Sequence, residues 1–246
     1  MSDTILTFQG VHAGYGRVEI LKELSFSVER GQVLGIIGPN GSGKTTMLNA
    51  LSGMIRPSSG RILYEGEDIS SLSASARCRR GIARTFQIPR PFERMSVYEN
   101  VLAAAVFGAG MTEKNARGPA MEVLQTTGLT AHSARRAGEL TLLDRKRLEI
   151  ARAMASRPKL LLLDEVAAGL TVSEVDDVIA LIRDLRAIGF TILWIEHMIY
   201  ALLQSVTQML CMAEGQAVIQ GDPLEVVHSD LVKSLYLGSQ TEDARA

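Results

Sequence analysis

The sequence has few features of a secreted, metal-binding or nucleic-acid-binding protein. Its 246 residues include only two cysteines, Cys78 and Cys211, and these lack the close spacing of metal ligands. We therefore expect two free thiols in a reducing compartment. Basic residues are not in excess, because 26 Lys and Arg face 27 Asp and Glu and the net charge is −1. Such a balance gives no general attraction to nucleic acid.

Long apolar runs are also missing. No stretch approaches the ~18 consecutive apolar residues that a membrane-spanning helix requires. Residues 1–4 lack the basic start and apolar stretch of a signal peptide. We expect a chain that stays in the cytoplasm and reaches a membrane only through a partner. Internal repeats, low-complexity tracts and sustained heptads are absent too, and 46% hydrophobic with 22% charged residues is an ordinary globular balance.

The hydrophobic pattern predicts an α/β protein whose middle third is helical. Strands are expected at residues 4–11, 18–28, 32–37, 61–64, 159–163, 190–194 and 209–212. Helices are expected at residues 44–52, 97–107, 114–127, 145–155, 173–188 and 197–204. The alternation of strands and helices outside the middle third indicates βαβ units with a parallel sheet.

The strongest chemical signal lies between the third strand and the first helix. Gly38-Pro39-Asn40-Gly41-Ser42-Gly43-Lys44-Thr45 fits the phosphate-loop pattern G-x-x-x-x-G-K-[ST]. Its glycines let the backbone wrap around phosphate, and the following helix directs its positive N-terminus at the same anion. We expect Lys44 to reach the β- and γ-phosphates and the Thr45 hydroxyl to bind Mg²⁺. A chance glycine-rich turn is the alternative, which the strand before and the helix after disfavour.

A second signal is an apolar strand that ends in two acids. Leu160–Leu163 is followed directly by Asp164 and Glu165. This order places two carboxylates at the carboxyl edge of the sheet, where α/β proteins bind ligands. Asp164 could then hold Mg²⁺, and Glu165 could polarise an attacking water as general base. Taken alone, the run is equally consistent with a core strand ending in a solvated turn. Beside a phosphate loop, the functional interpretation is favoured.

Four further segments narrow the interpretation. They are Gly14-Tyr15-Gly16, Arg84-Thr85-Phe86-Gln87, Arg147-Leu148-Glu149-Ile150-Ala151-Arg152-Ala153 and Trp194-Ile195-Glu196-His197. In this order and spacing, the chain resembles an ABC ATPase domain over nearly its whole length. The resemblance implies that Tyr15 stacks on adenine, Gln87 contacts Mg²⁺ and water, and His197 contacts the γ-phosphate. Taken singly, these three residues would be a turn aromatic, a surface amide and a structural histidine.

The resemblance also implies a site and an architecture. ATP would be bound by Tyr15 and by Gly38, Pro39, Asn40, Gly41, Ser42, Gly43, Lys44, Thr45 and Thr46. Mg²⁺ would be held by Thr45, Gln87 and Asp164, and the catalytic residues would be Gln87, Glu165 and His197. The implied fold is a P-loop NTPase core with a parallel sheet, an antiparallel N-terminal β subdomain and an inserted helical subdomain. Within one domain of residues 1–246, the core covers about 1–87 and 156–238, the insertion about 88–155 and a tail 239–246.

Three segments are similar to those of branched-chain amino-acid importer ATPases. They are residues 81–92, residues 95–101 and the ending Tyr236-Leu237-Gly238. The implied function is ATP hydrolysis that drives import of branched-chain amino acids or related small polar or aromatic solutes. The implied partners are two membrane-spanning permease subunits, a second and different ATPase subunit in a head-to-tail dimer, and indirectly a solute-binding protein. Nucleic acid is not expected as a partner, and the chain would lie peripherally at the cytoplasmic face of the inner or plasma membrane.

Other functions remain as alternatives. The lipopolysaccharide-export ATPases are also similar in this region and are the nearest one. DNA-repair and chromosome ATPases with such heads usually flank a long coiled coil, which no heptad run supports here. Translation factors of this family carry two ATPase domains, whereas this chain has one phosphate loop.

The chain departs from the family pattern at its signature loop. The family has Leu-Ser-Gly-Gly-Gln, with the third position often varied in these importers, and this chain has Leu140-Thr141-Leu142-Leu143-Asp144. Thr141 and Asp144 also fit the capping-box pattern ahead of the helix expected at 145–155. We expect Asp144 to occupy a helix N-terminus that would otherwise face a phosphate. Val166 in place of proline and Thr171 in place of Asp or Asn are further departures.

Several charged residues have a simpler interpretation. We expect the basic cluster Arg77, Arg79 and Arg80 to form a solvated face, and His12, His132 and His228 to be structural. Contact with a membrane subunit is a minor hypothesis for Arg84, Arg90 and Arg94.

Overall fold

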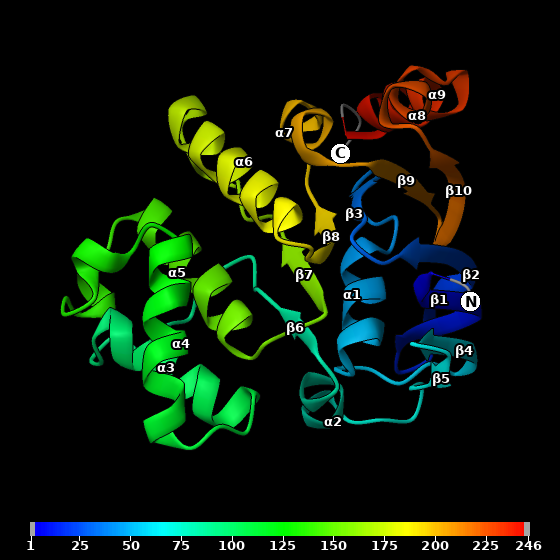
Figure 1. Cartoon of the computed structure of the whole chain (residues 1–246). Helices are drawn as coiled ribbons and strands as arrows, with labels where there is room; N and C mark the ends of the chain where they lie inside the picture. Colours follow the sequence, from blue (N-terminus) through cyan, green and yellow to red (C-terminus); the bar gives the residue numbers. More distant parts are fainter. Residues whose placement is uncertain (1–2, 244–246) are drawn as a thin grey trace. The chain divides into compact units, whose positions relative to one another are not determined.

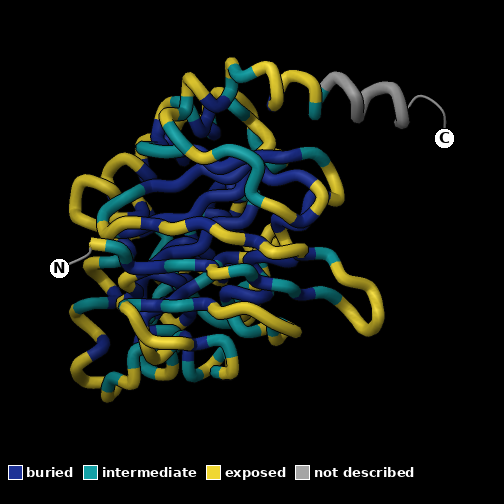
Figure 2. Tube along the Cα trace, turned by 90° about the vertical axis from the view of Figure 1, so that its right-hand side faces the viewer, coloured by how far each residue is buried: buried dark blue, intermediate teal, exposed yellow. Residues whose placement is uncertain are grey.

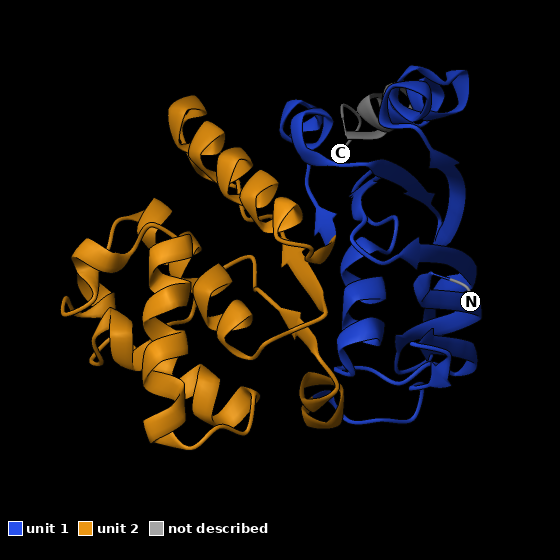
Figure 3. Ribbon diagram, viewed as in Figure 1, with its two compact units in different colours: residues 1–74, 193–246 blue, residues 75–192 orange. Residues whose placement is uncertain are grey.

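The computed structural model describes residues 3–243, and its side chains are described as far as Tyr236. The chain forms two compact units (Figure 3): residues 1–74 with 193–246, and residues 75–192. The chain returns from the second unit to the first within strand β8 (Thr191–Ile195). The expected division, a core of about 1–87 and 156–238 with an insertion of about 88–155, stays a prediction; the two compact units have other bounds, because the strands on both sides of the insertion belong to the second unit.

The first unit contains an antiparallel sheet in the order β2-β1-β4-β5. Its strands are β1 (Thr4–Tyr15), β2 (Val18–Glu29), β4 (Ser59–Tyr64) and β5 (Glu67–Asp68). Phe8 in β1 stacks on Phe26 in β2, with 4.6 Å between ring centroids. Gly60 allows β4 to approach β1 closely, because a Cβ there would lie 2.1 Å from the Gly10 carbonyl oxygen. The expected antiparallel subdomain is thereby confirmed.

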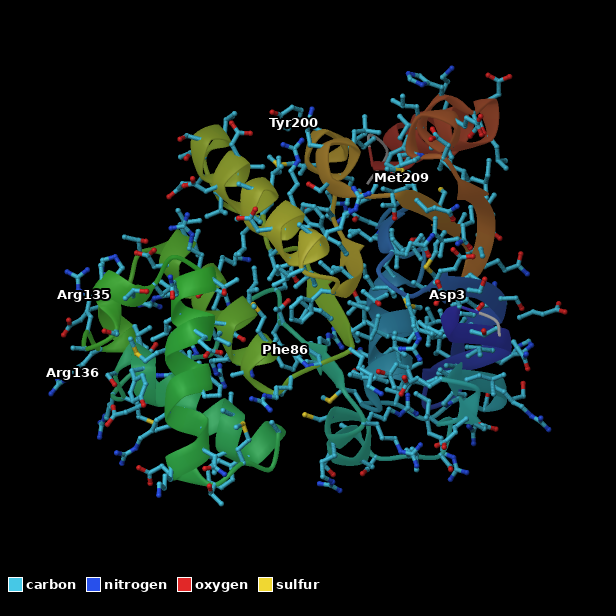
Figure 4. The ribbon with its side chains drawn as sticks, viewed as in Figure 1. Asp3, Phe86, Arg135, Arg136, Tyr200 and Met209 are labelled. Carbon is cyan, nitrogen blue, oxygen red and sulfur yellow. The ribbon has the colours of Figure 1, made fainter. Side chains whose placement is uncertain are left out.

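The first unit also contains the strand and helix that flank the phosphate-loop sequence (Figure 1). These are β3 (Val33–Ile37) and α1 (Lys44–Ser52), and the unit is completed by α7 (Ile199–Ser205), β9 (Gln208–Ala213), β10 (Gln216–Gly221), α8 (Pro223–His228) and α9 (Asp230–Asp243). β3 pairs parallel with β9, where Gly35 lies opposite Met209 (labelled in Figure 4). All five residues of β3 are buried, as is usual for a parallel strand covered on both faces.

The second unit combines two parallel strands with a helical cluster. Its elements are α2 (Ala74–Arg79, beginning at the unit boundary), β6 (Ile82–Arg84), α3 (Val97–Gly108), α4 (Glu113–Thr126), η1 (Thr130–His132), η2 (Ala137–Glu139), α5 (Leu142–Ala155), β7 (Leu160–Asp164) and α6 (Val172–Ala187). β6 pairs parallel with β7. Helices α3, α4 and α5 pack together around buried residues that include Val101, Leu124 and Leu148. The capping box of Ser96 and Glu99 starts α3.

Most of the expected elements are present, with differences at their ends. β1 continues to Tyr15, and α5 begins at Leu142, three residues before the expected start, because Thr141 caps it. The expected tail of 239–246 is helical as far as Asp243, and residues 244–246 lie outside the described part. The pattern did not predict α2, β5, β6, β10, α8 or α9, most of which are short. One burial expectation is wrong: Arg77 is 1% exposed and does not lie on a solvated face.

Burial follows the strands in both units. In Figure 2 many of the buried stretches run along strands, whereas the loops carry mostly exposed residues. The antiparallel strands β2, β4 and β5 also carry exposed residues. Among residues 3–243, no helix is long and apolar enough to cross a membrane. The described residues also hold no group of three or more His, Cys, Asp and Glu side chains suited to a metal ion.

Candidate functional site

The phosphate-loop segment connects β3 to α1 in a conformation that depends on glycine. Gly41 and Gly43 have φ of 79° and 99°, values that other residues rarely adopt. Gly38 is confined further, because a Cβ there would lie 2.2 Å from the Met212 carbonyl oxygen. Gly43 is the N-cap of α1, so the loop ends where the positive end of a helix begins.

Two polar side chains are enclosed by this loop. Lys44 is 6% exposed, and its ammonium donates to the carbonyls of Gly38 at 2.7 Å and Pro39 at 3.0 Å. The Ser42 hydroxyl is fully buried and has no hydrogen-bond partner among the described residues. A cation and an unsatisfied donor within a glycine loop at a helix N-terminus match the chemistry of a phosphate group. Of the two threonines in the first turn of α1, Thr45 is exposed and Thr46 is buried.

Cys211 lies in β9, which pairs with β3, the strand that leads into the loop. Its thiol is not activated as a nucleophile. Burial raises the pKa of its thiol to about 11, an effect that the nearby Lys44 ammonium partly offsets. A neutral thiol is a poor nucleophile. Both Cys78 and Cys211 are free, in agreement with the sequence.

The C-terminal helix α9 reaches the first residue of the loop. The Gly38 N–H donates to the Tyr236 hydroxyl at 3.0 Å, across 198 residues of sequence. Burial raises the pKa of Tyr236, so this hydroxyl is neutral at physiological pH. The sequence drew attention to Tyr236 only through its family resemblance, because no local pattern links a C-terminal tyrosine to a loop near residue 40.

Tyr236→Phe tests the strength of this contact. The variant removes only the hydroxyl, leaves the Gly38 N–H without its acceptor, and is expected to lower the free energy of unfolding by about 0.5–1.5 kcal/mol. Thermal denaturation without nucleotide measures the change. Tyr98→Phe is the matched control, because the Tyr98 hydroxyl makes no hydrogen bond within the described residues. Equal melting temperatures for Tyr236→Phe and wild type would show that the contact stabilises nothing.

Two other expected site residues lie in the first unit. Tyr15 ends β1, is 48% exposed, and its hydroxyl accepts a hydrogen bond of 2.5 Å from Asn49 in α1. Its exposed ring has room for a planar partner. His197 is exposed just beyond β8, and its backbone N–H donates to the buried Glu196 carboxylate at 3.0 Å.

In the second unit, β7 ends at a buried carboxylate. Asp164 is 5% exposed, and its Oδ2 accepts from Arg84 at 2.7 Å. The Arg84 guanidinium also lies over the Phe86 ring, 5.4 Å from its centroid (Phe86 is labelled in Figure 4). Oδ1 makes no hydrogen bond within the described residues, so one carboxylate oxygen is open to a cation. The ion pair was not predicted, since 80 residues separate its partners.

The side chains of Glu165, directly after β7, and Gln87, shortly after β6, contact each other. The Gln87 side-chain amide donates to the Glu165 carboxylate. Lys146 of α5 donates to the backbone carbonyls of both residues, at 2.8 Å to Gln87 and 3.0 Å to Glu165. The second unit therefore brings together Gln87, Asp164 and Glu165 as expected, and adds Lys146, which the sequence did not single out.

In the altered signature segment, residues 140–144, Thr141 and Asp144 hydrogen-bond to each other. Thr141 is the N-cap of α5: its hydroxyl accepts from the Asp144 N–H at 3.2 Å and donates to the Asp144 carboxylate at 3.0 Å. Asp144 is 8% exposed and pairs with His132 and Arg147, each at 3.7 Å. Asp144 thus occupies the N-terminal turn of α5 as the sequence predicts. His132, expected to be structural, has its Nε2 3.7 Å from the Asp144 carboxylate.

The candidate residues are divided between the two units. Tyr15, the loop Gly38–Thr46 and His197 belong to the first unit. Gln87, Asp164, Glu165 and the signature segment belong to the second. Each group has a chemically consistent local arrangement. The group in the first unit has a glycine loop whose chemistry matches a phosphate. The group in the second unit has two carboxylates, one of which accepts a hydrogen bond from the Gln87 amide.

Comparison with known proteins identifies the family of this chain. The ABC transporter family model matches residues 21–168. The branched-chain amino acid transport ATP-binding protein BraF of Pseudomonas aeruginosa is 36% identical, over 97% of this chain and 99% of its own length. The lipopolysaccharide export ATP-binding protein LptB of Haemophilus influenzae is 33% identical, over 96% of this chain and 98% of its own.

Solved structures give the same answer for the fold. An ATP-binding cassette of an ABC transporter in its ADP conformation superposes with a TM-score of 0.87 at 31% identity, over 96% of this chain and 99% of that one. A nucleotide-free cassette superposes with a TM-score of 0.86 at 30% identity, over 95% and 98% of the two chains. The expected fold class is confirmed, and the chain belongs to the ABC transporter family as one of its ATP-binding ATPase subunits.

Proposed function

We propose that this chain hydrolyses MgATP to drive an ABC importer of branched-chain amino acids or related small polar or aromatic solutes. Family membership already establishes ATP binding and hydrolysis in transport. The observation that carries the ATP site is the glycine loop around Lys44, with its enclosed and unpartnered Ser42 hydroxyl. The importer assignment is supported by the 36% identity to a branched-chain amino acid transport protein over nearly the whole length of both chains.

Each candidate residue takes a specific role in this proposal. Lys44 and the backbone of Gly38–Thr46 bind the phosphates, and the exposed ring of Tyr15 stacks on adenine. Glu165 is the general base, Gln87 orients the attacking water, and His197 contacts the γ-phosphate. Thr45, Gln87 and Asp164 would hold Mg²⁺, which would neutralise charge on the phosphates. The open Oδ1 of Asp164 and the exposed Thr45 support this ligand set.

The nearest alternative is lipopolysaccharide export, because LptB proteins are 31–34% identical over almost the same length. The two functions make different demands on the ATPase. For an importer, ATP turnover in proteoliposomes should rise when a solute-loaded binding protein is added outside. For an exporter, it should respond to lipopolysaccharide in the membrane instead. Stimulation by lipopolysaccharide alone would replace the importer assignment.

We further propose that the chain acts at the cytoplasmic face of the inner or plasma membrane, with two permease subunits and a second, different ATPase subunit. In a head-to-tail dimer, the signature segment of each chain would face the ATP of the other. Here that position holds Leu142, Leu143 and Asp144 in place of two glycines and a glutamine. The carboxylate of Asp144 lies in the first turn of α5, where a phosphate would otherwise be attracted. The dimer would then have unequal sites, and the hydrolytic one would use Lys44 and Glu165 of this chain.

Mutating the catalytic glutamate of each subunit separately tests this asymmetry. Glu165→Gln in this chain should remove most of the ATP turnover of the assembled transporter. The same change in the second ATPase should have a much smaller effect, because the ATP facing Asp144 turns over slowly. The measurement is phosphate release by each singly mutated assembly. Equal losses from the two mutations would contradict unequal sites, as would strong hydrolysis by this chain alone as a homodimer.

A further inference from the structure

Lys146 is a buried cation in the first turns of α5. The whole residue is only 2% exposed. An ammonium removed from water is costly unless its hydrogen bonds are replaced within the protein. Lys146 obtains two of them from backbone carbonyls, those of Gln87 and Glu165. These acceptors come from two segments that are far apart in sequence.

The three residues form a closed hydrogen-bonded ring. Lys146 Nζ lies 2.8 Å from the Gln87 carbonyl oxygen and 3.0 Å from that of Glu165. The ring is completed by the Gln87 side-chain amide, which donates to the Glu165 carboxylate. One cation therefore holds the backbones of two residues whose side chains contact each other.

The backbone of Glu165 gives an independent reason for such a tether. Its φ is +47°, in the left-handed region that residues with a Cβ enter at a cost in energy. A conformation of this kind persists only where the surrounding structure imposes it. The Lys146 ammonium bonds the carbonyl of this residue, and the following Val166 is 1% exposed and anchored in the interior.

We propose that Lys146 is a positioning residue for ATP hydrolysis, which holds Glu165 in its left-handed conformation with its carboxylate against Gln87. The proposal rests on the roles proposed above for Glu165 and Gln87. Lys146 acts through these two residues and itself touches no phosphate. Its removal should therefore impair the chemical step and leave nucleotide binding by the Lys44 loop unchanged.

Lys146→Met is the first test, because methionine keeps an unbranched side chain and removes the ammonium. In the assembled transporter, kcat should fall by about 10²-fold, the size of effect that a misplaced catalytic group produces. The Kd for MgATP should stay within about twofold of wild type, since the phosphate loop is untouched. A wild-type kcat would overturn the proposal, and so would a loss of binding that matches the loss of rate.

A double mutant separates positioning from a general loss of stability. In the Glu165→Gln background, Lys146→Met should cause little further loss of kcat, because the group that it positions is already disabled. An additional loss of about 10²-fold in that background would mean that Lys146 acts by another route. Val101→Ala, in the buried helical cluster, is the stability control, with a lower melting temperature and a normal kcat.

Two further variants keep the outcomes distinct. If Lys146→Met does not fold, Lys146→Gln provides a neutral donor that is too short for both carbonyls, and its kcat should still fall by at least about tenfold. Wild-type turnover by Lys146→Gln would then overturn the proposal. Normal hydrolysis by Glu165→Gln alone would instead refute the proposed general base, independently of Lys146.

Discussion

Glu165→Gln is expected to lower ATP turnover by about 10²–10⁴-fold, because glutamine keeps the shape of the side chain and cannot accept a proton from water. Nucleotide binding should persist, since Lys44 and the glycine loop are unchanged. Steady-state phosphate release by the assembled transporter, together with the Kd for MgATP, checks both parts.

A matched control makes the Glu165 result specific. Glu122→Gln changes the same functional group on an exposed position of α4 and should leave turnover at the wild-type rate. If both variants hydrolyse ATP normally, Glu165 is not the general base. If both lose activity, the assay reports a general effect of lost charge.

Lys44→Ala is expected to abolish most of the stabilisation that MgATP gives the folded chain. The variant removes the buried ammonium that lies within the phosphate loop. A ligand that binds only the folded state at 100 times its Kd contributes about 2.7 kcal/mol, so losing it should largely remove the ATP-dependent rise in melting temperature. Differential scanning measurements with and without MgATP give this difference directly.

The Lys44 prediction also has a control and a clear contrary result. Lys114→Ala removes a lysine from an exposed position of α4 and should keep the full ATP-dependent shift. The ligand-free melting temperature of Lys44→Ala should be recorded too, because the carbonyls of Gly38 and Pro39 lose a donor. An unchanged ATP-dependent shift in Lys44→Ala would contradict nucleotide binding at this loop.

The phosphate loop was predictable from sequence because its chemistry is local. The conformations that the fit to phosphate requires are encoded in neighbouring residues: glycines at 41 and 43 adopt positive φ, and the helix after Gly43 starts where expected. The acidic pair after β7 was predictable for a similar reason, since an apolar strand fixes where Asp164 emerges. The capping of α5 by Thr141 followed from a pattern that spans only four residues.

Contacts between distant segments were not predictable in this way. Tyr236 bonds Gly38 across 198 residues, and Lys146 bonds Gln87 across 59. The basic cluster also misplaced Arg77, because clustered basic residues usually indicate a solvated face, and in this chain tertiary packing buries one of them. The ion pair between Arg84 and Asp164 belongs to the same class, since it depends on β6 pairing with β7.

ATP hydrolysis by the wild-type chain, assembled with its permease subunits in proteoliposomes, tests the central claim most directly. The quantity to measure is steady-state phosphate release in the presence of Mg²⁺, with EDTA as the metal-free comparison. The account predicts turnover on the order of 1–10³ s⁻¹, typical of enzymes, in the presence of Mg²⁺, its loss in EDTA, and its loss in Glu165→Gln assemblies that still bind MgATP. Turnover that continues at the wild-type rate when Glu165 is replaced in this chain would contradict the account.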